Sequence, residues 1–371
     1  QRALANNSVA YTDKPDMEGF MREWLSLVES KSGERGIFSR VAADKHVEMN
    51  GRRETGHEWG TNPCSEIILR PYQFCNLTEV VVRQGDDLEN LRRKVRLATI
   101  LGTAQSTFTK MPYLRKIWQK NTEEERLLGV SLTGIMDNYL LSKTEDSKKW
   151  LKELKAQAID VNRIYADKLG VPASAAITCV KPSGTVSQLT DTASGIHARH
   201  SKYYIRTVRG DNKDPLTQFM KDSGIPAEPC VMKPDSTTVF SFPTKSPSGA
   251  VTRNDMTALQ QLELWKNYAL HWCEHKPSVT ITVKDAEWMA VGAWVYENFD
   301  ICSGISFLPH SDHTYAQAPY QDIDEETYND LKKQMPTSID WTALSNYEKV
   351  DTTSGSQTLA CTAGACELVD I

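Results

Sequence analysis

The sequence predicts an α/β fold built from parallel β-α units, and three observations support this prediction. Short β-rich apolar segments alternate with longer segments whose apolar residues recur at helical spacing. Turn and cap signals separate several of these segments. The 371 residues are 40% hydrophobic and 25% charged, a composition that can bury a core. The alternation favours strands joined by helical crossovers over a β-sandwich or a helical bundle.

The first units lie before residue 181. Residues 75–82 predict a buried strand, and a turn with an N-cap signal precedes a helix with one apolar face at residues 88–101. A longer helix is expected at residues 148–169, where the glycine and proline that follow would end it. The next predicted strand, residues 175–180, runs directly into a polar loop.

Later units repeat the pattern. A strand at residues 237–242 precedes a helix at residues 256–273 with leucines on one face. Residues 278–283 are β-rich, residues 285–299 are helical, and residues 305–309 form a last short strand. The sequence then becomes polar from about residue 310 and contains no internal repeat.

Charge and cysteine content exclude several classes of protein. The net charge of −5 argues against a general electrostatic grip on nucleic acid or on an anionic membrane. No run of 18 apolar residues could span a membrane, and the first residues lack a signal peptide's apolar stretch. Eight cysteines without a Cys-x2-Cys pair predict neither a disulfide scaffold nor a zinc site. We therefore expect a cytoplasmic protein with no metal site.

The segment Asn62-Pro63-Cys64-Ser65-Glu66 places an amide, a thiol and a carboxylate at two-residue steps. In an extended loop all three could project to one side, where the carboxylate could take a proton from a substrate hydroxyl and the amide could hold an oxygen. The alternative is structural, because Asn-Pro is common in turns and an isolated cysteine is usually a small buried residue.

Further cysteines lie where redox chemistry could use them. Cys75 begins a predicted strand eleven positions after Cys64. Near the end of the chain, Cys361 and Cys366 lie in a Ser/Thr/Gly-rich segment, and their spacing permits a disulfide. A mobile dithiol of this kind suits electron delivery, because exchange requires a thiolate to approach a disulfide directly.

The loop after the strand at residues 175–180 is a candidate phosphate site. Ser183, Gly184 and Thr185 could turn their backbone N–H groups toward an anion. The segment lacks the full Walker pattern, so an ordinary turn remains the alternative.

Together these segments resemble the catalytic subunit of ribonucleotide reductases, and most of all the monomeric, adenosylcobalamin-dependent (class II) ribonucleoside-triphosphate reductases. The resemblance covers nearly the whole chain but only the C-terminal half of such an enzyme. The matching segments are residues 5–9, 60–67, 75–80, 180–186, 194–197, 317–319 and 364–366.

The resemblance implies a ten-stranded α/β barrel with a central finger loop around residues 60–70. By carry-over, Cys64 would be the thiyl radical that removes the 3′ hydrogen of a ribonucleotide, Glu66 would accept the 3′-hydroxyl proton, and Asn62 would orient the hydroxyls. Cys75 would be one of two thiols that reduce the 2′ position. Cys361 and Cys366 would re-reduce the resulting disulfide and be recharged by thioredoxin or glutaredoxin.

The resemblance also implies the remaining assignments. Ser183, Gly184 and Thr185 would hold the substrate polyphosphate, His197 could line the site, and adenosylcobalamin would supply the radical. Residues 1–310 would form the catalytic half-barrel, residues 311–351 a C-terminal extension and residues 352–371 a flexible redox-active tail.

The partner of Cys75 and the allosteric site belong to the family's N-terminal half, which is absent from this sequence. We therefore expect a split-gene product, a processed fragment or a partial chain that needs an N-terminal partner polypeptide to turn over.

Two alternatives remain. A class I large subunit would take its radical from a separate metal-bearing subunit, but it usually spaces its two cysteines further apart and carries a Tyr-Tyr pair where this chain has Ser306-Phe307. A non-catalytic remnant of a reductase is the other, although Cys64, Glu66 and the tail pair are all intact.

Overall fold

The computed structural model describes residues 7–30, 35–310, 315–348, 358–362 and 365–369. The chain forms two compact units. The first comprises residues 1–199 and 249–310, and the second comprises residues 200–248 and 311–371. Residues 200–248 therefore group with the segment after residue 310, where the sequence becomes polar.

Apart from a short two-stranded hairpin, the strands of the first unit form two sheets that meet at one bridge. Strands β5, β6 and β7 are parallel neighbours, and a parallel bridge between Val180 and Pro277 joins the segment after β7 to the segment before β11. Strand β11 is parallel to β12, β12 is antiparallel to β2, and β2 is parallel to β1. Five successive strands thus run in one direction before the direction reverses. The strands are β1 (Asn7–Tyr11), β2 (Arg35–Ser39), β5 (Asn76–Val81), β6 (Leu128–Thr133), β7 (Thr178–Cys179), β11 (Thr280–Val283) and β12 (Ile305–Pro309).

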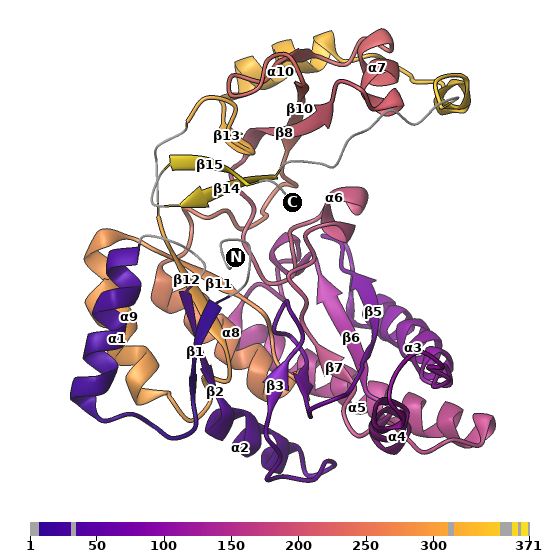
Figure 1. Cartoon of the computed structure of the whole chain (residues 1–371), viewed down its shortest axis with the longest axis vertical. Helices are drawn as coiled ribbons and strands as arrows, with labels where there is room; N and C mark the ends of the chain where they lie inside the picture. The colour runs from indigo at the N-terminus through magenta and orange to yellow at the C-terminus, as the bar shows by residue number, and fades with distance from the viewer. Residues whose placement is uncertain (1–6, 31–34, 311–314, 349–357, 363–364, 370–371) are drawn as a thin grey trace. The chain divides into compact units, whose positions relative to one another are not determined.

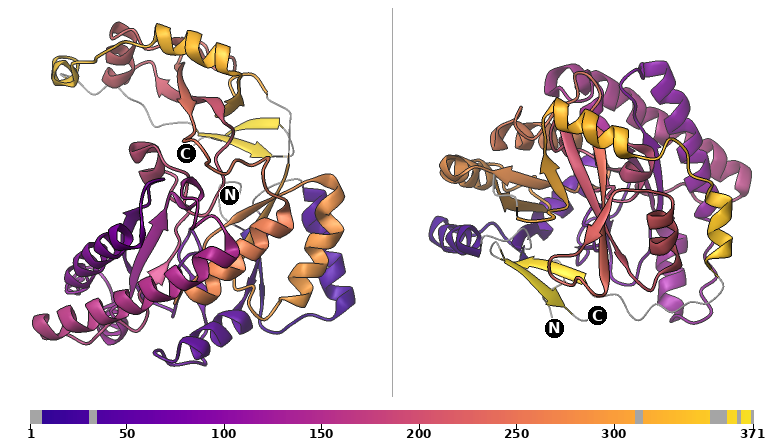
Figure 2. Two further views of the ribbon diagram at one scale, coloured as in Figure 1. Left: turned by 180° about the vertical axis from the view of Figure 1, so that it is seen from behind. Right: turned by 90° about the horizontal axis from the view of Figure 1, so that it is seen from above.

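Helices cover these strands on one side. Helix α3 packs on α5 and on β5, α5 packs on α8, and α1 packs on α9 (Figure 1). Viewed from behind, α5 and α8 lie in front of the strands (Figure 2). The helices are α1 (Met17–Ser30), α2 (Arg40–Asn50), α3 (Leu88–Gln105), α4 (Lys116–Glu125), α5 (Thr144–Leu169), α6 (Val186–Thr190), α8 (Ala258–His271) and α9 (Trp288–Glu297), with 3₁₀ turns at Ile135–Asp137 and Asp285–Glu287.

The cap signals in the sequence act as predicted. The Asp87 side chain accepts a hydrogen bond from the backbone N–H of Asn90 at the start of α3, and Gly170 ends α5 with a left-handed φ of 65°. Aromatic residues of α8 bind the helix layer to the sheet, since Trp272 donates to the carbonyl of Cys179 and Trp265 to that of Pro277.

Several expected elements differ in extent. Helix α5 begins at Thr144 rather than near residue 148, and β7 is only two residues long although residues 175–180 were expected to be extended. Ala176 and Ile177 still accept backbone hydrogen bonds from β6, so this stretch is bonded without regular strand geometry. The sequence pattern did not predict β6, whose six residues are all buried.

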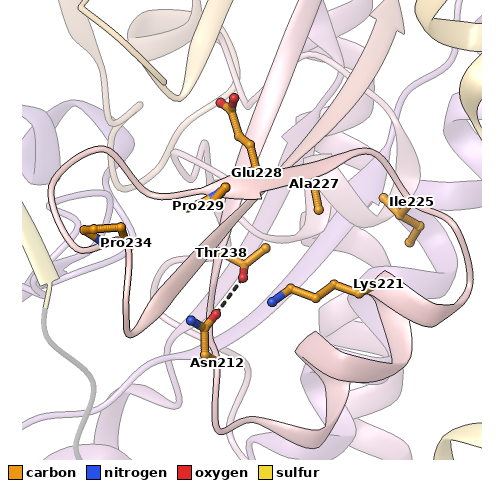
Figure 3. A pocket seen from close by; sticks show the side chains of 8 residues that line it. All are labelled: Asn212, Lys221, Ile225, Ala227, Glu228, Pro229, Pro234 and Thr238. Carbon is orange, nitrogen blue, oxygen red and sulfur yellow. Dashed lines mark hydrogen bonds between the residues drawn. The ribbon is translucent and has the colours of Figure 1, made fainter.

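The second unit has its own antiparallel sheet in the order β13-β8-β10-β9. A pocket of about 320 Å³ lies in this unit and is lined by residues that include Lys221, Glu228 and Thr238 (Figure 3). Its elements are β8 (Tyr203–Asp211), α7 (Pro215–Asp222), β9 (Ala227–Pro229), β10 (Thr237–Lys245), β13 (Tyr320–Asp322), α10 (Glu325–Gln334) and a 3₁₀ helix at Trp341–Asn346. Beyond them, β14 (Thr358–Thr362) pairs with β15 (Ala365–Val369).

Among the described residues, no helix combines the length and the apolar character that crossing a membrane requires.

Gly292 permits the close packing of α9 on α1. A Cβ added there would lie 2.6 Å from Nε1 of Trp24, whose side chain is buried. We expect Gly292→Ala to lower the free energy of unfolding by about 1–3 kcal/mol, as overpacking does in other cores. The measurement is urea denaturation, with Gly102→Ala as the matched control. Gly102 also lies inside a helix, but its added Cβ would make ordinary contacts of 3.4 Å or more, so this change should be neutral or stabilising. Equal effects of the two substitutions would contradict the packing argument.

Candidate active site

Residues 60–69 form a hairpin loop, which we call the finger loop. Strands β3 (Gly60–Thr61) and β4 (Ile68–Leu69) pair antiparallel at its base. At its tip the N–H of Ser65 donates to the carbonyl of Asn62 at 2.9 Å, and Ser65 takes a left-handed φ of 65°. The Asn62 side chain folds back to accept a hydrogen bond from the Ile67 N–H at 3.0 Å. The tip is therefore a tight turn rather than an extended strand.

A segment before β11, residues 275–278, holds this turn. Three successive loop carbonyls accept hydrogen bonds from it: the carbonyl of Cys64 from the Ser278 hydroxyl at 2.6 Å, that of Ser65 from the Lys276 ammonium, and that of Glu66 from the Lys276 N–H at 3.1 Å. The Lys276 ammonium also donates to the Ser65 hydroxyl at 3.0 Å. Consecutive backbone groups that would otherwise need water are thus satisfied by protein.

His275 fixes the base of the same loop. Its Nδ1 accepts from the Ile68 N–H at 3.3 Å, so Nε2 carries the proton and donates to the carbonyl of Leu128 at 2.9 Å. The side chain is fully buried, and burial lowers the pKa of His275 well below its usual range. A neutral His275 therefore bridges the finger loop and β6.

Arg53 supports the loop from the other side. Its guanidinium donates to the carbonyl of Ile68 at 2.8 Å and binds both oxygens of Glu125 at 2.9 and 2.8 Å. Its side chain is 3% exposed, so the pair is a buried, bidentate ion bridge that also orients the hairpin.

The predicted catalytic side chains fall into different environments. Cys64 is exposed at the loop tip, Asn62 is half-buried, and Glu66 is completely buried. The Lys181 ammonium lies 3.1 Å from Oε1 of Glu66, whereas Oε2 has no hydrogen-bond partner among the described residues. A buried carboxylate with one paired and one unpaired oxygen is suited to accepting a proton.

Cys75 and a second thiol lie close to this carboxylate. Cys75 is half-buried, and its pKa is raised by burial and by the charge of Glu66. Cys179 on β7 is fully buried, and the same two causes raise its pKa. Both residues are therefore neutral thiols rather than thiolates, which is the form that can give up a hydrogen atom.

A second carboxyl group, Glu79 on β5, shares these neighbours. Burial raises its pKa, the Ser183 hydroxyl and the Lys181 ammonium lower it, and the charge of Glu66 raises it further. Lys181 is thus electrostatically coupled to both carboxyl groups.

The predicted phosphate loop follows Lys181. Ser183 is buried with a left-handed φ of 57°, while Gly184 and Thr185 are exposed. After α6, the buried Arg199 binds the buried Asp137 at 2.8 Å and the exposed Asp191 at 2.9 Å. These contacts hold Asp191, the residue that directly follows α6, in place.

His197 has both ring nitrogens engaged. Nε2 accepts from the Thr280 N–H at 3.0 Å, so Nδ1 donates to the carbonyl of Ser194 at 3.0 Å. It connects the phosphate-loop region to β11, beside a cavity of about 60 Å³.

Cys361 and Cys366 lie opposite each other in the antiparallel register of β14 and β15. The structure describes only the backbone here, and it places these two positions at the same level of a two-stranded ribbon.

Sequence reasoning missed four residues of this site: Lys181, Glu79, Lys276 and Ser278. The available signal was His275-Lys276-Pro277-Ser278, a polar segment directly before a predicted strand. Among the described residues, no group of three or more potential ligands could hold a metal ion.

Known proteins are similar to this chain, although no protein-family model matches it. An adenosylcobalamin-dependent ribonucleoside-triphosphate reductase of Lactobacillus leichmannii is 27% identical over 99% of this chain and 53% of its own length. A reductase of the same name from Euglena gracilis is 28% identical over 83% of this chain and 42% of its own. A probable one from Dictyostelium discoideum is 29% identical over 77% of this chain and 38% of its own.

A solved structure shows the same relationship. The crystal structure of a B12-dependent (class II) ribonucleotide reductase matches with a TM-score of 0.77 and 25% identity, over 92% of this chain and 51% of that one. This chain is a homologue of these reductases. The expected α/β fold and the resemblance to half of a class II reductase are thereby confirmed.

The chain spans about half the length of these reductases or less. The alpha subunit of an Actinobacillus ureae class Id ribonucleotide reductase is also similar, with a TM-score of 0.55 and 14% identity over 82% of this chain and 65% of that one. The likeness to the class Id subunit shows a shared fold alone.

The buried Lys276 should make stability depend on pH. Burial lowers its pKa from 10.5 to about 8. Between these values the unfolded chain binds the extra proton, so the free energy of unfolding should rise with pH, by about 3 kcal/mol in all. We expect Lys276→Met to remove this rise. The measurement is urea denaturation of both proteins between pH 7 and pH 11.

The control for this test is Lys94→Met, which removes a more exposed lysine from the ion pair with Asp86. It should keep the wild-type pH dependence. An unchanged pH dependence in Lys276→Met would contradict the assignment.

Proposed function

We propose that this chain is the catalytic half of a class II ribonucleotide reductase, which reduces ribonucleotides, with triphosphates as the expected substrates, to 2′-deoxyribonucleotides. The observation that supports it most is the finger loop, where an exposed Cys64 thiol lies two residues from a buried, lysine-paired Glu66. The homologues described above are named for this reaction. Because the chain corresponds to about half of them, the rest of the reductase must come from a second polypeptide or segment.

In this proposal Cys64 takes part as a thiyl radical. It removes the hydrogen at C3′ of the ribose and later returns it. Its exposure at the end of a clamped loop lets a substrate reach it, while the hydrogen bond from Ser278 to its carbonyl keeps the thiol in place. Glu66 accepts the proton of the 3′ hydroxyl, and its free Oε2 is the atom available for that proton.

Asn62 orients the substrate hydroxyls with its side-chain amide. Its Oδ1 is engaged with the Ile67 N–H, so the NH₂ group is the part of the side chain left to bind substrate. The backbone of Ser183, Gly184 and Thr185 would hold the polyphosphate, and His197 would keep this loop beside β11.

Cys75 supplies reducing power. Loss of the 2′ hydroxyl as water consumes two electrons, which two thiols provide when they form a disulfide; Cys75 is one, and its partner lies in the other half of the enzyme. Cys361 and Cys366 would reduce that disulfide by exchange and then be reduced by thioredoxin or glutaredoxin. Residues 352–371 would form this relay, after a half-barrel at residues 1–310 and an extension at residues 311–351.

The proposed cofactor is adenosylcobalamin. When bound, it supplies an organic radical, a chemistry that no ordinary side chain can start. The feature of this chain that fits such a cofactor is the exposed thiol of Cys64, to which the radical would pass. Glu66 is buried and Cys75 is half-buried, so both are less accessible than the Cys64 thiol.

The experiment that tests this function is reconstitution with the missing half of the reductase. The complex should reduce ribonucleotides only when adenosylcobalamin is present, and Cys64→Ser should abolish turnover and the cofactor-linked exchange of the 5′ hydrogens. Product is measured as deoxyribonucleotide by chromatography. Cys230→Ser, which replaces a thiol of the second unit, is the matched control and should retain activity. Activity without cobalamin that an iron or manganese subunit restores would establish a class I enzyme instead, and no activity with either would favour a remnant.

The tail makes a separate prediction. The double variant Cys361→Ser, Cys366→Ser should complete its first turnover, because Cys75 and its partner provide the first two electrons. It should then stop when thioredoxin is the reductant, and dithiothreitol should restore cycling because a small thiol reaches the active site directly. Single-turnover and steady-state assays separate these outcomes. Normal cycling with thioredoxin would exclude the tail pair as the relay.

A further inference from the structure

The carboxylate of Glu66 is buried among groups that act on its charge in opposite directions. The ammonium groups of Lys181 and Lys276 attract this charge, while the carboxyl group of Glu79 repels it. The titratable thiols coupled to Glu66 are Cys75 and Cys179, whose pKa values it raises. The cation that contacts the Glu66 carboxylate directly therefore decides how its charge is compensated.

Only one of the two lysines reaches the Glu66 side chain in the described structure. The Lys276 ammonium donates to the carbonyl and hydroxyl of Ser65. Its contact with Glu66 is a backbone hydrogen bond from the Lys276 N–H to the Glu66 carbonyl. Lys181 places its ammonium 3.1 Å from Oε1 of Glu66. Lys181 is therefore the direct counter-ion.

The backbone of Lys181 is fixed on two sides. Its N–H donates to the Ser131 hydroxyl at 2.8 Å, and Gly195 packs so closely on its carbonyl that any Cβ at residue 195 would clash. The ammonium is thus delivered from an anchored position at the start of the predicted phosphate loop. Although burial lowers the pKa of Lys181, the charge and hydrogen bond of Glu66 outweigh this and raise it. Lys181 therefore stays charged over the whole neutral range.

We propose that Lys181 is a positioning residue for Glu66: it keeps the buried carboxylate ionised and fixes Oε1, so that Oε2 is the oxygen presented to the substrate proton. This inference rests on the proposed role of Glu66 in ribonucleotide reduction. Removing the ammonium leaves Glu66 buried beside Glu79 with no direct counter-ion. Without that ammonium the carboxylate binds a proton more readily, and a protonated carboxyl cannot act as a base.

The first test needs no enzyme activity. In the full chain with ¹³C-labelled glutamate, the Glu66 side-chain signal is assigned as the one missing from Glu66→Gln and is followed by NMR as a function of pH. In Lys181→Met its titration midpoint should move up by about one to three pH units, the usual effect of an adjacent charge. Lys181→Arg should return the midpoint toward the wild-type value.

Two controls make the result specific. Lys94→Met removes a lysine of similar exposure from an ion pair on α3 and should leave the Glu66 midpoint unchanged. If Lys181→Met does not fold, Lys181→Gln takes its place, since it keeps a hydrogen-bond donor without the charge and should shift the midpoint in the same way. An unchanged midpoint in both uncharged variants overturns the proposal.

The second test uses the reconstituted reductase. The acidic limb of the pH profile of kcat should move to higher pH in Lys181→Met, with activity recovering as pH rises, and Lys181→Arg should restore the wild-type profile. A uniform loss of kcat at every pH would show a structural role and overturn the inference. If the wild-type complex has no reductase activity, the proposed function fails, while the NMR titration still decides whether Lys181 controls Glu66.

Discussion

The finger loop depends on hydrogen bonds with the segment at residues 275–278, shortly before β11. A tight turn with a left-handed residue at its tip exposes consecutive carbonyl groups in one direction, and an irregular loop of this kind has no strand partner to satisfy them. Lys276 and Ser278 supply the missing donors and His275 supplies an acceptor, so the carbonyls of residues 64–66 and the N–H of Ile68 are all paired. Because residues 275–278 continue directly into the sheet, the position of the exposed thiol is tied to the rigid part of the unit.

This arrangement requires space, and glycines provide it. A Cβ on Gly304 would lie 2.7 Å from the Lys276 ammonium and 3.1 Å from the Ser65 hydroxyl. A Cβ on Gly129 of β6 would overlap Leu77 and would lie 2.8 Å from Ile67 of the finger loop. Strand β6 therefore carries a residue without a side chain at the point where the finger loop packs against it. A larger residue at either position would displace the loop rather than merely crowd the core.

Three buried ion pairs lie around the same loop or in its neighbourhood. Arg53 pairs with Glu125 at the base, Lys181 pairs with Glu66 near the tip, and Arg199 pairs with Asp137 next to the chain that follows α6. Removing one partner of such a pair leaves an uncompensated charge, which costs far more than the pair contributes when intact. The buried polar groups of the site thus have few alternative partners, and this fixes the geometry of the site.

The sequence by itself determined the local features: the N-cap at Asp87, the helix stop at Gly170, the strands at 76–81 and 305–309, and the pairing of thiol and carboxylate at Cys64 and Glu66. These follow from neighbouring residues, whose propensities and spacing act over a few positions. The local pattern did not predict strand β6, because Leu-Gly-Val-Ser-Leu-Thr mixes apolar residues with small and polar ones. All six are buried because neighbouring elements pack on both faces of the strand. Only the tertiary structure shows that Glu66 is buried while Cys64 is exposed. It also brings two distant lysines to the finger loop: Lys181 lies 115 residues after Glu66, and Lys276 lies more than 200 residues after Ser65. Contacts between residues so far apart are fixed by strand order and core packing, and no local pattern records them.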